Sequence, residues 1–257
     1  MLRLLNIEIH KLKYNSASRV LILIYFILLT SIALIAAIKF DIGPVKFHLA
    51  EMGIFDFPYI WHFNTYVAAI LKLFLPIVIV SMMANEYSYG TLKQNLIDGM
   101  SKKEFVISKF IAIVLFAAIS TLFVFLVSLV LGLVFSSFNE VGIIFSHMEY
   151  LFAYFIKLVG FFSFCLFLGM LAKRSAFALA FLFVDYILEW IIFGLITWKG
   201  SYELAEKIQN FFPLKSMYNL IKQPVQRIVM SKFPDKTEIA YDYALHWYEL
   251  VIVLGWT

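Results

Sequence analysis

Four ionisable side chains lie inside stretches of the chain that are otherwise apolar: Lys72, Lys157, Asp185 and Glu189. Charged groups are costly inside a membrane, and they commonly pair with one another or line a functional path. Asp185 and Glu189 are four residues apart, so they share one face of a helix. At about 1.5 Å per residue, Lys72, Lys157 and Glu189 lie at a similar depth. We therefore predict an ion pair between Glu189 and Lys157 or Lys72, with a contact along a substrate path and snorkelling lysines as the alternatives.

The spacing of the remaining polar residues gives little support for other kinds of chemistry. The sequence has no G-x-x-x-x-G-K-[ST] phosphate loop, no H-E-x-x-H motif and no G-x-S-x-G turn. The lone Cys165 excludes a cysteine-based metal site and a disulfide framework. We expect no metal site and no ATP hydrolysis by this chain itself. A membrane enzyme that acts on lipids, with Asp185 and Glu189 as acid and base, is kept as an alternative.

The segment Asn85–Glu104 (NEYSYGTLKQNLIDGMSKKE) has more order in its sequence than a simple connector needs. Gly90 breaks the chain, and Thr91 is suited to N-cap a short helix with Leu92–Asp98 as its interior. Gly99 is placed to close that helix in a left-handed conformation.

The residues after this short helix predict the start of another. Ser101 and Glu104 have the spacing of a capping box, and an apolar stretch follows them. The short helix would offer Leu92, Leu96 and Ile97 on one face. This pattern fits either a docking element for a partner protein or a surface helix that only links two spans.

The elements that must position these residues are membrane-spanning helices. Of the 257 residues, 63% are hydrophobic and 15% are charged, whereas soluble domains are roughly half apolar and a quarter charged. Helices are expected because lipid offers no partner for backbone polar groups. The predicted fold is an all-α, polytopic bundle of about six spans, the last one incomplete, in a single transmembrane domain. The apolar stretches are residues 20–38, 66–84, 111–135, 150–171, 177–197 and the short run 247–257.

Basic residues in the short loops predict the orientation of the bundle. Lys and Arg are frequent before the first span and in the second and fourth loops, and scarce in the first and third loops. The N-terminus and the even-numbered loops are therefore expected in the cytoplasm, in a bacterial inner membrane. The long fifth loop is an exception, because it carries seven basic residues among interspersed acidic ones. The formal charge of +4 includes no long basic run, so we expect no nucleic-acid partner.

Two further regions predict helices that do not span. Leu2–Tyr14 mixes apolar and charged residues as an amphipathic helix at the cytoplasmic surface would, although a frayed basic tail is possible on composition alone. The fifth loop has short apolar faces before Pro213 and before Pro224, which are typical of outer re-entrant helices or of a small folded cap.

The stretch Glu86–Lys109 (EYSYGTLKQNLIDGMSKKEFVISK) resembles the corresponding loop of ABC-2-type transporter permeases. Members of that family carry an acidic residue, a Gly-Thr pair, a short coupling helix, a Ser/Thr-basic pair and a Lys at the start of the third span. The chain departs from the pattern where many members have Pro, since Gly99 and Met100 stand there. The corresponding residues here are Glu86, Gly90, Thr91, Leu92–Asp98 with Leu96, Ile97 and Asp98, then Ser101 with Lys102, and Lys109.

The resemblance implies a permease subunit of an ATP-driven transporter, usually an exporter. It implies a second permease subunit, as a homodimer or heterodimer, and a separate ATP-binding cassette subunit that binds ATP and Mg and grips the coupling helix. Membrane lipids are the remaining expected partner. Lys109, near the cytoplasmic end of its span, is expected to snorkel. A scaffold that transports nothing is the second alternative.

Overall fold

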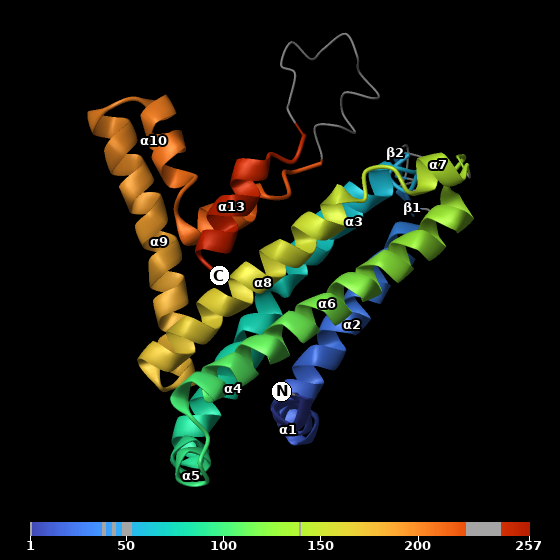
Figure 1. The fold of residues 1–257 in the computed structure, drawn as a ribbon. Helices are drawn as coiled ribbons and strands as arrows, with labels where there is room; N and C mark the ends of the chain where they lie inside the picture. Colours follow the sequence, from blue (N-terminus) through green and yellow to red (C-terminus); the bar gives the residue numbers. More distant parts are fainter. Residues whose placement is uncertain (1, 38–39, 43–44, 48–52, 139, 225–242) are drawn as a thin grey trace.

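The computed structural model describes residues 2–37, 40–42, 45–47, 53–138, 140–224 and 243–257, with only the backbone described for residues 2–4, 32–37 and both strands. The fold is predominantly helical (Figure 1). A two-stranded antiparallel hairpin, which the sequence did not predict, pairs β1 (Phe40–Ile42) with β2 (Val45–Phe47) after α2. The helices are α1 (Leu2–Tyr14), α2 (Ser16–Ala37), α3 (Tyr59–Leu71), the 3₁₀ turn η2 (Lys72–Phe74), α4 (Leu75–Ser88), α5 (Thr91–Ile97), α6 (Lys102–Phe135), α7 (Val141–Ile144), α8 (Glu149–Ala172), α9 (Ser175–Lys199), α10 (Tyr202–Gln209), α11 (Pro213–Asn219) and α13 (Trp247–Gly255).

Four helical stretches in the described part are long and apolar enough to cross a membrane: Tyr59–Ser88, Lys102–Phe135, Val141–Ala172 and Ser175–Lys199. A fifth is added if α1 and α2, which meet at 87°, are counted together. The structure therefore supports a multi-pass membrane protein. The stretches are longer than the predicted ones because helices continue into polar flanks once they are capped. The predicted sixth span coincides with α13, which has nine residues.

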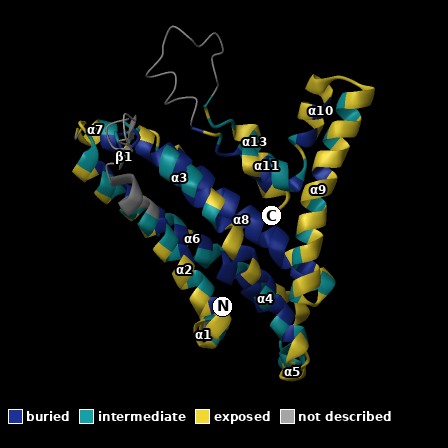
Figure 2. Cartoon of the chain, turned by 180° about the vertical axis from the view of Figure 1, so that it is seen from behind, coloured by how far each residue is buried: buried dark blue, intermediate teal, exposed yellow. Residues whose placement is uncertain are grey.

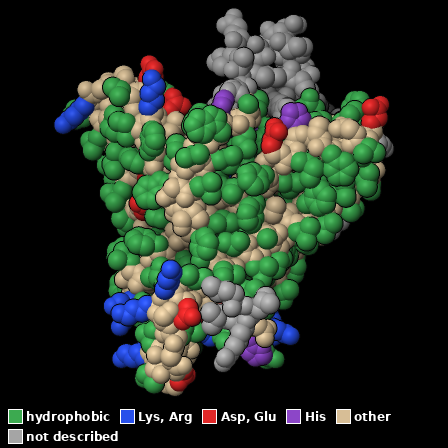
Figure 3. All heavy atoms as spheres, in the orientation of Figure 1, with side chains coloured by type: hydrophobic (Ala, Val, Ile, Leu, Met, Phe, Trp, Pro, Cys, Tyr) green, Lys and Arg blue, Asp and Glu red, His purple; other side chains and the backbone are tan. Residues whose placement is uncertain are grey.

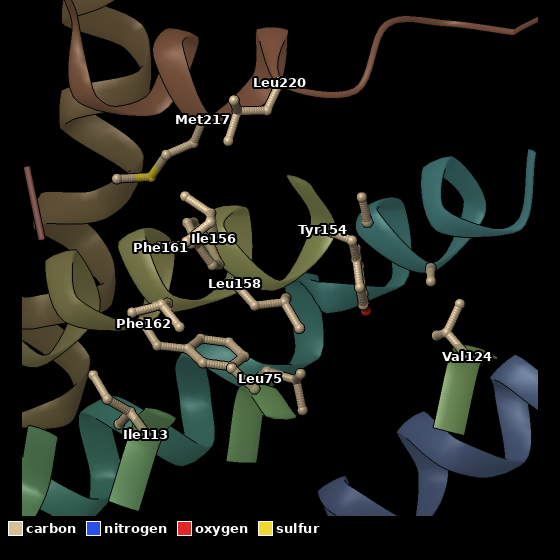
Figure 4. Close-up of a cluster of buried hydrophobic side chains, with 14 of the residues drawn as sticks. Leu75, Ile113, Val124, Tyr154, Ile156, Leu158, Phe161, Phe162, Met217 and Leu220 are labelled. Atoms are coloured by element: carbon tan, nitrogen blue, oxygen red, sulfur yellow. The ribbon is translucent and has the colours of Figure 1, made fainter. Parts of the chain in front are cut away.

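The helix α8 lies at the centre of the bundle and α9 at its edge. In the most apolar window of each span, 78% of the residues are buried for the span that contains α8, against 28% for α6 and 6% for α9. Figure 2 shows the contrast, with α8 mostly dark blue and α9 mostly yellow. Phe162 and Leu158 of α8 face Leu75 of α4 and Ile113 of α6 (Figure 4). The core is thus built on α8, and α9 offers its apolar surface to lipid or to another subunit.

The two ends of the molecule differ. One end carries α1 and α5, and the other carries α7, the β-hairpin and α10 (Figure 1). Figure 3 shows Lys and Arg side chains gathered at the end with α5 and again over α10, with a broad hydrophobic band between. The short helix α5 therefore lies at one end of the molecule, beyond the hydrophobic band.

Candidate functional site

The loop between α4 and α6 folds as a short, closed helix. Gly90 has a φ of 69° and is the N-cap of α5, so Thr91 is the first helical residue rather than the predicted cap. The helix ends at Ile97, one residue before the predicted Asp98. Gly99, at φ 96°, closes it as predicted, because its left-handed backbone lets the N–H of Met100 reach the carbonyl of Asn95 at 3.0 Å.

The predicted capping box at the start of α6 is confirmed. The Glu104 N–H donates to Ser101 Oγ at 3.1 Å, and the Ser101 N–H donates to Glu104 Oε2 at 2.9 Å. Two orphan donors of the helix start are satisfied in this way. Two residues, Gly99 and Met100, lie between Asp98, the C-cap of α5, and Ser101, the N-cap of α6. The connection between α5 and α6 is therefore very short.

The predicted apolar face of α5 is divided between two environments. Leu92 packs against the hydrophobic core, and Leu96 is half-buried. Ile97 is 78% exposed, and Tyr89, just before the helix, is 77% exposed. Asp98 is exposed and accepts a hydrogen bond from Gln94 at 3.1 Å. One side of α5 therefore anchors the helix, and the other presents apolar and polar groups outward.

A buried ionic cluster ties α5 to the bundle. Lys109 Nζ of α6 lies 2.5 Å from Glu8 Oε2 of α1 and 2.5 Å from Glu86 Oε1 of α4. Lys11 Nζ of α1 donates to the same Glu86 oxygen at 2.7 Å, and the Thr91 hydroxyl of α5 donates to Glu86 Oε2. We call Glu8, Lys11, Glu86, Thr91 and Lys109 the ionic cluster. Four helices, α1 and the consecutive α4, α5 and α6, thus meet through one carboxylate, Glu86.

The expected snorkelling of Lys109 is wrong. Its side chain is 1% exposed, and two carboxylates inside the bundle neutralise it and accept hydrogen bonds from it. Lys109 therefore points into the bundle rather than to the membrane surface.

The helix α1 has the predicted bounds, but one of its charged residues points inward. Glu8 is 3% exposed, whereas Ile7 and Ile9 are 38% and 42% exposed. Charged residues of an amphipathic helix usually lie on its water side. Glu8 instead lies on the side of Leu12, which packs against the core, and the buried ammonium of Lys109 pairs with it there. The orientation of α1 therefore follows its ionic partner as well as its apolar residues.

The charges in the cluster balance, with two carboxylates against two ammonium groups. Partial burial by itself would lower the pKa of Lys11, but the hydrogen bond to Glu86 and the charge of Glu8 outweigh it and raise that pKa above its usual value. Lys11 is thus held charged at neutral pH. It bridges Glu86 and Glu8, at 2.7 Å and 3.4 Å.

A groove of about 350 Å³ opens beside the cluster, between the α1–α2 elbow and the end of α4. Its lining is mixed, with charged, amide, hydroxyl and aromatic groups. The lining includes Lys11, Asn15, Asn85, Glu86, Tyr89 and Thr91. Water therefore reaches the edge of the cluster through this groove, although Glu86 itself is buried.

The predicted ion pair between Glu189 and a lysine is wrong. Glu189 Oε1 accepts from the Leu214 N–H at 2.8 Å, and Oε2 accepts from the Lys215 N–H at 3.0 Å. The carboxylate thus binds the free amides at the start of α11, a favourable place for negative charge. Asp185, one turn earlier on α9, has a buried Oδ2 without a hydrogen-bond partner among the described residues. The two acids of the alternative enzyme hypothesis therefore lie in different environments.

Lys72 and Lys157 lie elsewhere in the bundle. Lys72 is in η2 and Lys157 is on α8, and their side chains are 9% and 3% exposed. Lys72 Nζ lies over the ring of Phe161, 4.2 Å from its centroid. Within the described ranges, neither lysine forms an ion pair with a carboxylate.

A protein family is known whose sequence profile matches most of the chain. The sequence profile of the family described as "Protein of unknown function (DUF2705)" matches residues 29–217, from α2 to α11. The chain belongs to the DUF2705 family. It is also similar to the "Uncharacterized protein YhcI" of Bacillus subtilis (strain 168), with 36% identity over 63 residues. That match covers 24% of this chain and 20% of the relative's length. No solved structure matches the chain.

Within this DUF2705 chain, the sequence pointed to Glu86 and Thr91 but missed Glu8 and Lys11 as parts of the same site. Both lie before residue 29, outside the region that the family profile matches. The signal available in the sequence was the presence of Glu8 on the same face as Leu5 and Leu12, where a charge needs a partner.

Proposed function

We propose that this chain is the membrane-spanning permease subunit of an ATP-driven transporter of the ABC-2 type, and that it works as an exporter. ATP hydrolysis is assigned to a separate ATP-binding cassette subunit that docks on α5. The end with α1 and α5 then faces the cytoplasm of a bacterial cell, and the end with α10 faces outward. The observation that supports this proposal is a short exposed helix held between two spans by the ionic cluster.

A helix that transmits movement must be attached to the spans that move. The start of α5 is tied to α4 through Thr91 and Glu86, and its end leads directly into the capping box of α6. The 34 residues of α6 extend over about 50 Å. A push on α5 therefore displaces α6, which runs the length of the bundle. The helix α1 moves with α6 because Glu8 of α1 pairs with Lys109 of α6.

The exposed surface of α9 supports a second permease subunit. This helix is apolar, yet only 6% of its most apolar window is buried within the chain. Lipid covers such a helix in a monomer, and a second copy or a related subunit covers part of it in a dimer. The proposal includes such a dimer, surrounded by membrane lipids.

The docking assignment is tested by co-purification from the native host in mild detergent. The variant Ile97→Asp places a charge at a side chain that is 78% exposed, so the bundle itself is left intact. The matched control is Val141→Asp on α7, at the opposite end, where the side chain is 70% exposed. We expect the wild type and Val141→Asp to retain an ATP-hydrolysing subunit and Ile97→Asp to lose most of it.

Two readouts decide the matter: mass-spectrometric identification of the retained subunit and vanadate-sensitive ATP hydrolysis by the purified complex. Full retention of the ATPase by Ile97→Asp overturns docking on α5. Purification of a wild-type chain that brings no ATPase, yet modifies lipids without nucleotide, favours the enzyme alternative instead.

A further inference from the structure

Two buried lysines on the inner surface of the bundle have no carboxylate to neutralise them among the described residues. Lys157 Nζ donates to the backbone carbonyl of Tyr218 at 3.3 Å and lies 5.6 Å from the centre of its ring. Lys72 Nζ lies over the face of Phe161, 4.2 Å from the centre of the ring. Phe161 follows Lys157 by four residues on α8, so Lys157 and the ring that Lys72 contacts share one face of that helix. An ammonium group has three donors, so most of these donors lack an acceptor in the described chain.

The acid that was expected to pair with these lysines is engaged elsewhere. Both oxygens of Glu189 accept hydrogen bonds from amides at the start of α11. Asp185 Oδ2 is buried on α9 without a partner in the described segments. The two lysines are therefore left without a carboxylate among the described residues, in a region where an ionisable group is expensive and usually marks a path for an ion or a polar ligand.

The local backbone is also irregular at Lys72. The span that carries this lysine changes from α-helix to a tighter turn, because α3 ends at Leu71, the 3₁₀ turn η2 holds Lys72–Phe74, and α4 continues with Pro76 in its first turn. A stretch of 3₁₀ helix inside a longer helix often marks a functional hinge or a strained place.

The helix α11 forms the third side of the region around Lys72 and Lys157. Its Tyr218 carbonyl holds Lys157, and Met217 and Leu220 are directed toward Ile156 and Phe161 of α8 (Figure 4). Glu189 fixes the start of α11 to α9. The lysines thus lie between the 3₁₀ turn η2, the central helix α8 and the short helix α11, which is tethered to α9.

We propose that Lys72 and Lys157 together bind an anionic oxygen group, such as the phosphate of a lipid-like amphiphile, with Phe161 and Tyr218 beside it. Taking this group as the transported substrate rests on the proposed function. Its binding does not, because this chain alone supplies both cations. The shared chemistry fits a lipid headgroup or a free phosphate, and the experiment separates these two sources.

The experiment uses the full chain purified without any ATPase and incorporated in nanodiscs. Native mass spectrometry counts the phosphatidylglycerol or phosphatidylcholine molecules, with identical acyl chains, that remain bound. The wild type is expected to retain phosphatidylglycerol preferentially. The variant Lys72→Gln/Lys157→Gln is expected to weaken that retention about tenfold, as for loss of a charge-assisted hydrogen bond. The matched control, Lys103→Gln/Lys207→Gln, removes the same charge from two exposed lysines and is expected to behave as wild type.

Inorganic phosphate is titrated in the same assay to identify the source of the anion. Displacement of phosphatidylglycerol at millimolar phosphate indicates that a free anion suffices, and no displacement indicates that the lipid is required. Equal retention of both lipids by the wild type overturns the proposal whatever the variants do. So does undiminished retention by the double variant. A wild-type chain that retains no ATPase but still binds the anion contradicts the proposed function alone, so the two failures are distinguishable.

Discussion

Replacing Lys109 by Met tests the ionic cluster most directly. Met keeps the length of the side chain and its apolar stem but removes the ammonium group. Glu8 and Glu86, which are 3% and 2% exposed, then lose their shared cation, while Lys11 still reaches Glu86. The variant leaves one excess negative charge inside the bundle.

The expected cost follows from the burial of Lys109. Its side chain is 1% exposed and its Nζ lies 2.5 Å from each carboxylate, so water screens neither contact. Removing one partner of a buried ion pair typically destabilises a protein by about 3–5 kcal/mol, because the remaining charge is left uncompensated. Replacing both members of a buried pair by neutral groups costs much less, since the desolvation penalty also disappears. Glu8→Gln in the Lys109→Met background leaves Lys11 paired with Glu86, and it should therefore recover most of the loss.

The free energy of unfolding is measured by steric trapping in bicelles, and hydrogen exchange of α1 and α5 reports where the structure loosens. The control is Lys103→Met, an exposed lysine in the first turn of the same helix. Its expected effect is within about 0.5 kcal/mol. If Lys109→Met costs no more than Lys103→Met, or if the charge-balanced double variant Lys109→Met/Glu8→Gln is no better than the single one, the cluster does not hold the helices together.

Three further predictions concern backbone and helix ends. Gly132→Ala should destabilise the fold by about 1–3 kcal/mol, because an added Cβ would lie 2.2 Å from Phe57 Cζ; Gly194→Ala, with open space around it, is the control, and equal thermal midpoints for the two would contradict this packing. Glu189→Gln keeps one acceptor oxygen and loses the other, so amide exchange in the first turn of α11 should accelerate while α8 is unchanged; unaltered exchange there would disprove the capping role. Gly99→Ala forces a left-handed residue with a Cβ, at a cost of about 1–2 kcal/mol, and should raise exchange in α5 selectively; uniform exchange across the bundle would be the contrary result.

The sequence predicted the features whose causes are local. Ser101 and Glu104 lie three residues apart, so their reciprocal capping is visible in the sequence, and the left-handed closure at Gly99 follows from the same short stretch. The apolar stretches located the main spans because lipid imposes helix over about 20 residues. The bounds of α1 were also predictable from its mixture of apolar and charged residues.

The sequence did not predict which distant charges meet. Lys109 and Glu8 are 101 residues apart, and their contact depends on how α1 bends against α2. Glu189 was matched by depth to the lysines, but depth says nothing about the direction in which a side chain points around its helix. Its actual partner, the start of α11, became available only because Pro213 begins a helix there. Thr91 shows the same effect over a shorter distance. Gly90 is the N-cap of α5 in place of Thr91, and the Thr91 hydroxyl donates to Glu86 instead.

The arrangement of donors around Glu86 suggests how α5 would move under the proposed mechanism. Lys11 and Lys109 both donate to Oε1, whereas Thr91 is the donor to Oε2 among the described residues. A tilt of α5 therefore breaks the hydrogen bond from the uncharged Thr91 hydroxyl and leaves both ammonium contacts in place. Gly90 and Gly99, each at a positive φ with open space around it, lie at the two ends of the helix where such a tilt must be absorbed. The cluster would thus keep α1, α4 and α6 together as a unit while α5 changes its angle to an attached ATPase. An ionic cluster suits this role better than apolar packing would, because its geometry fixes the partners and its separate contacts can be broken one at a time.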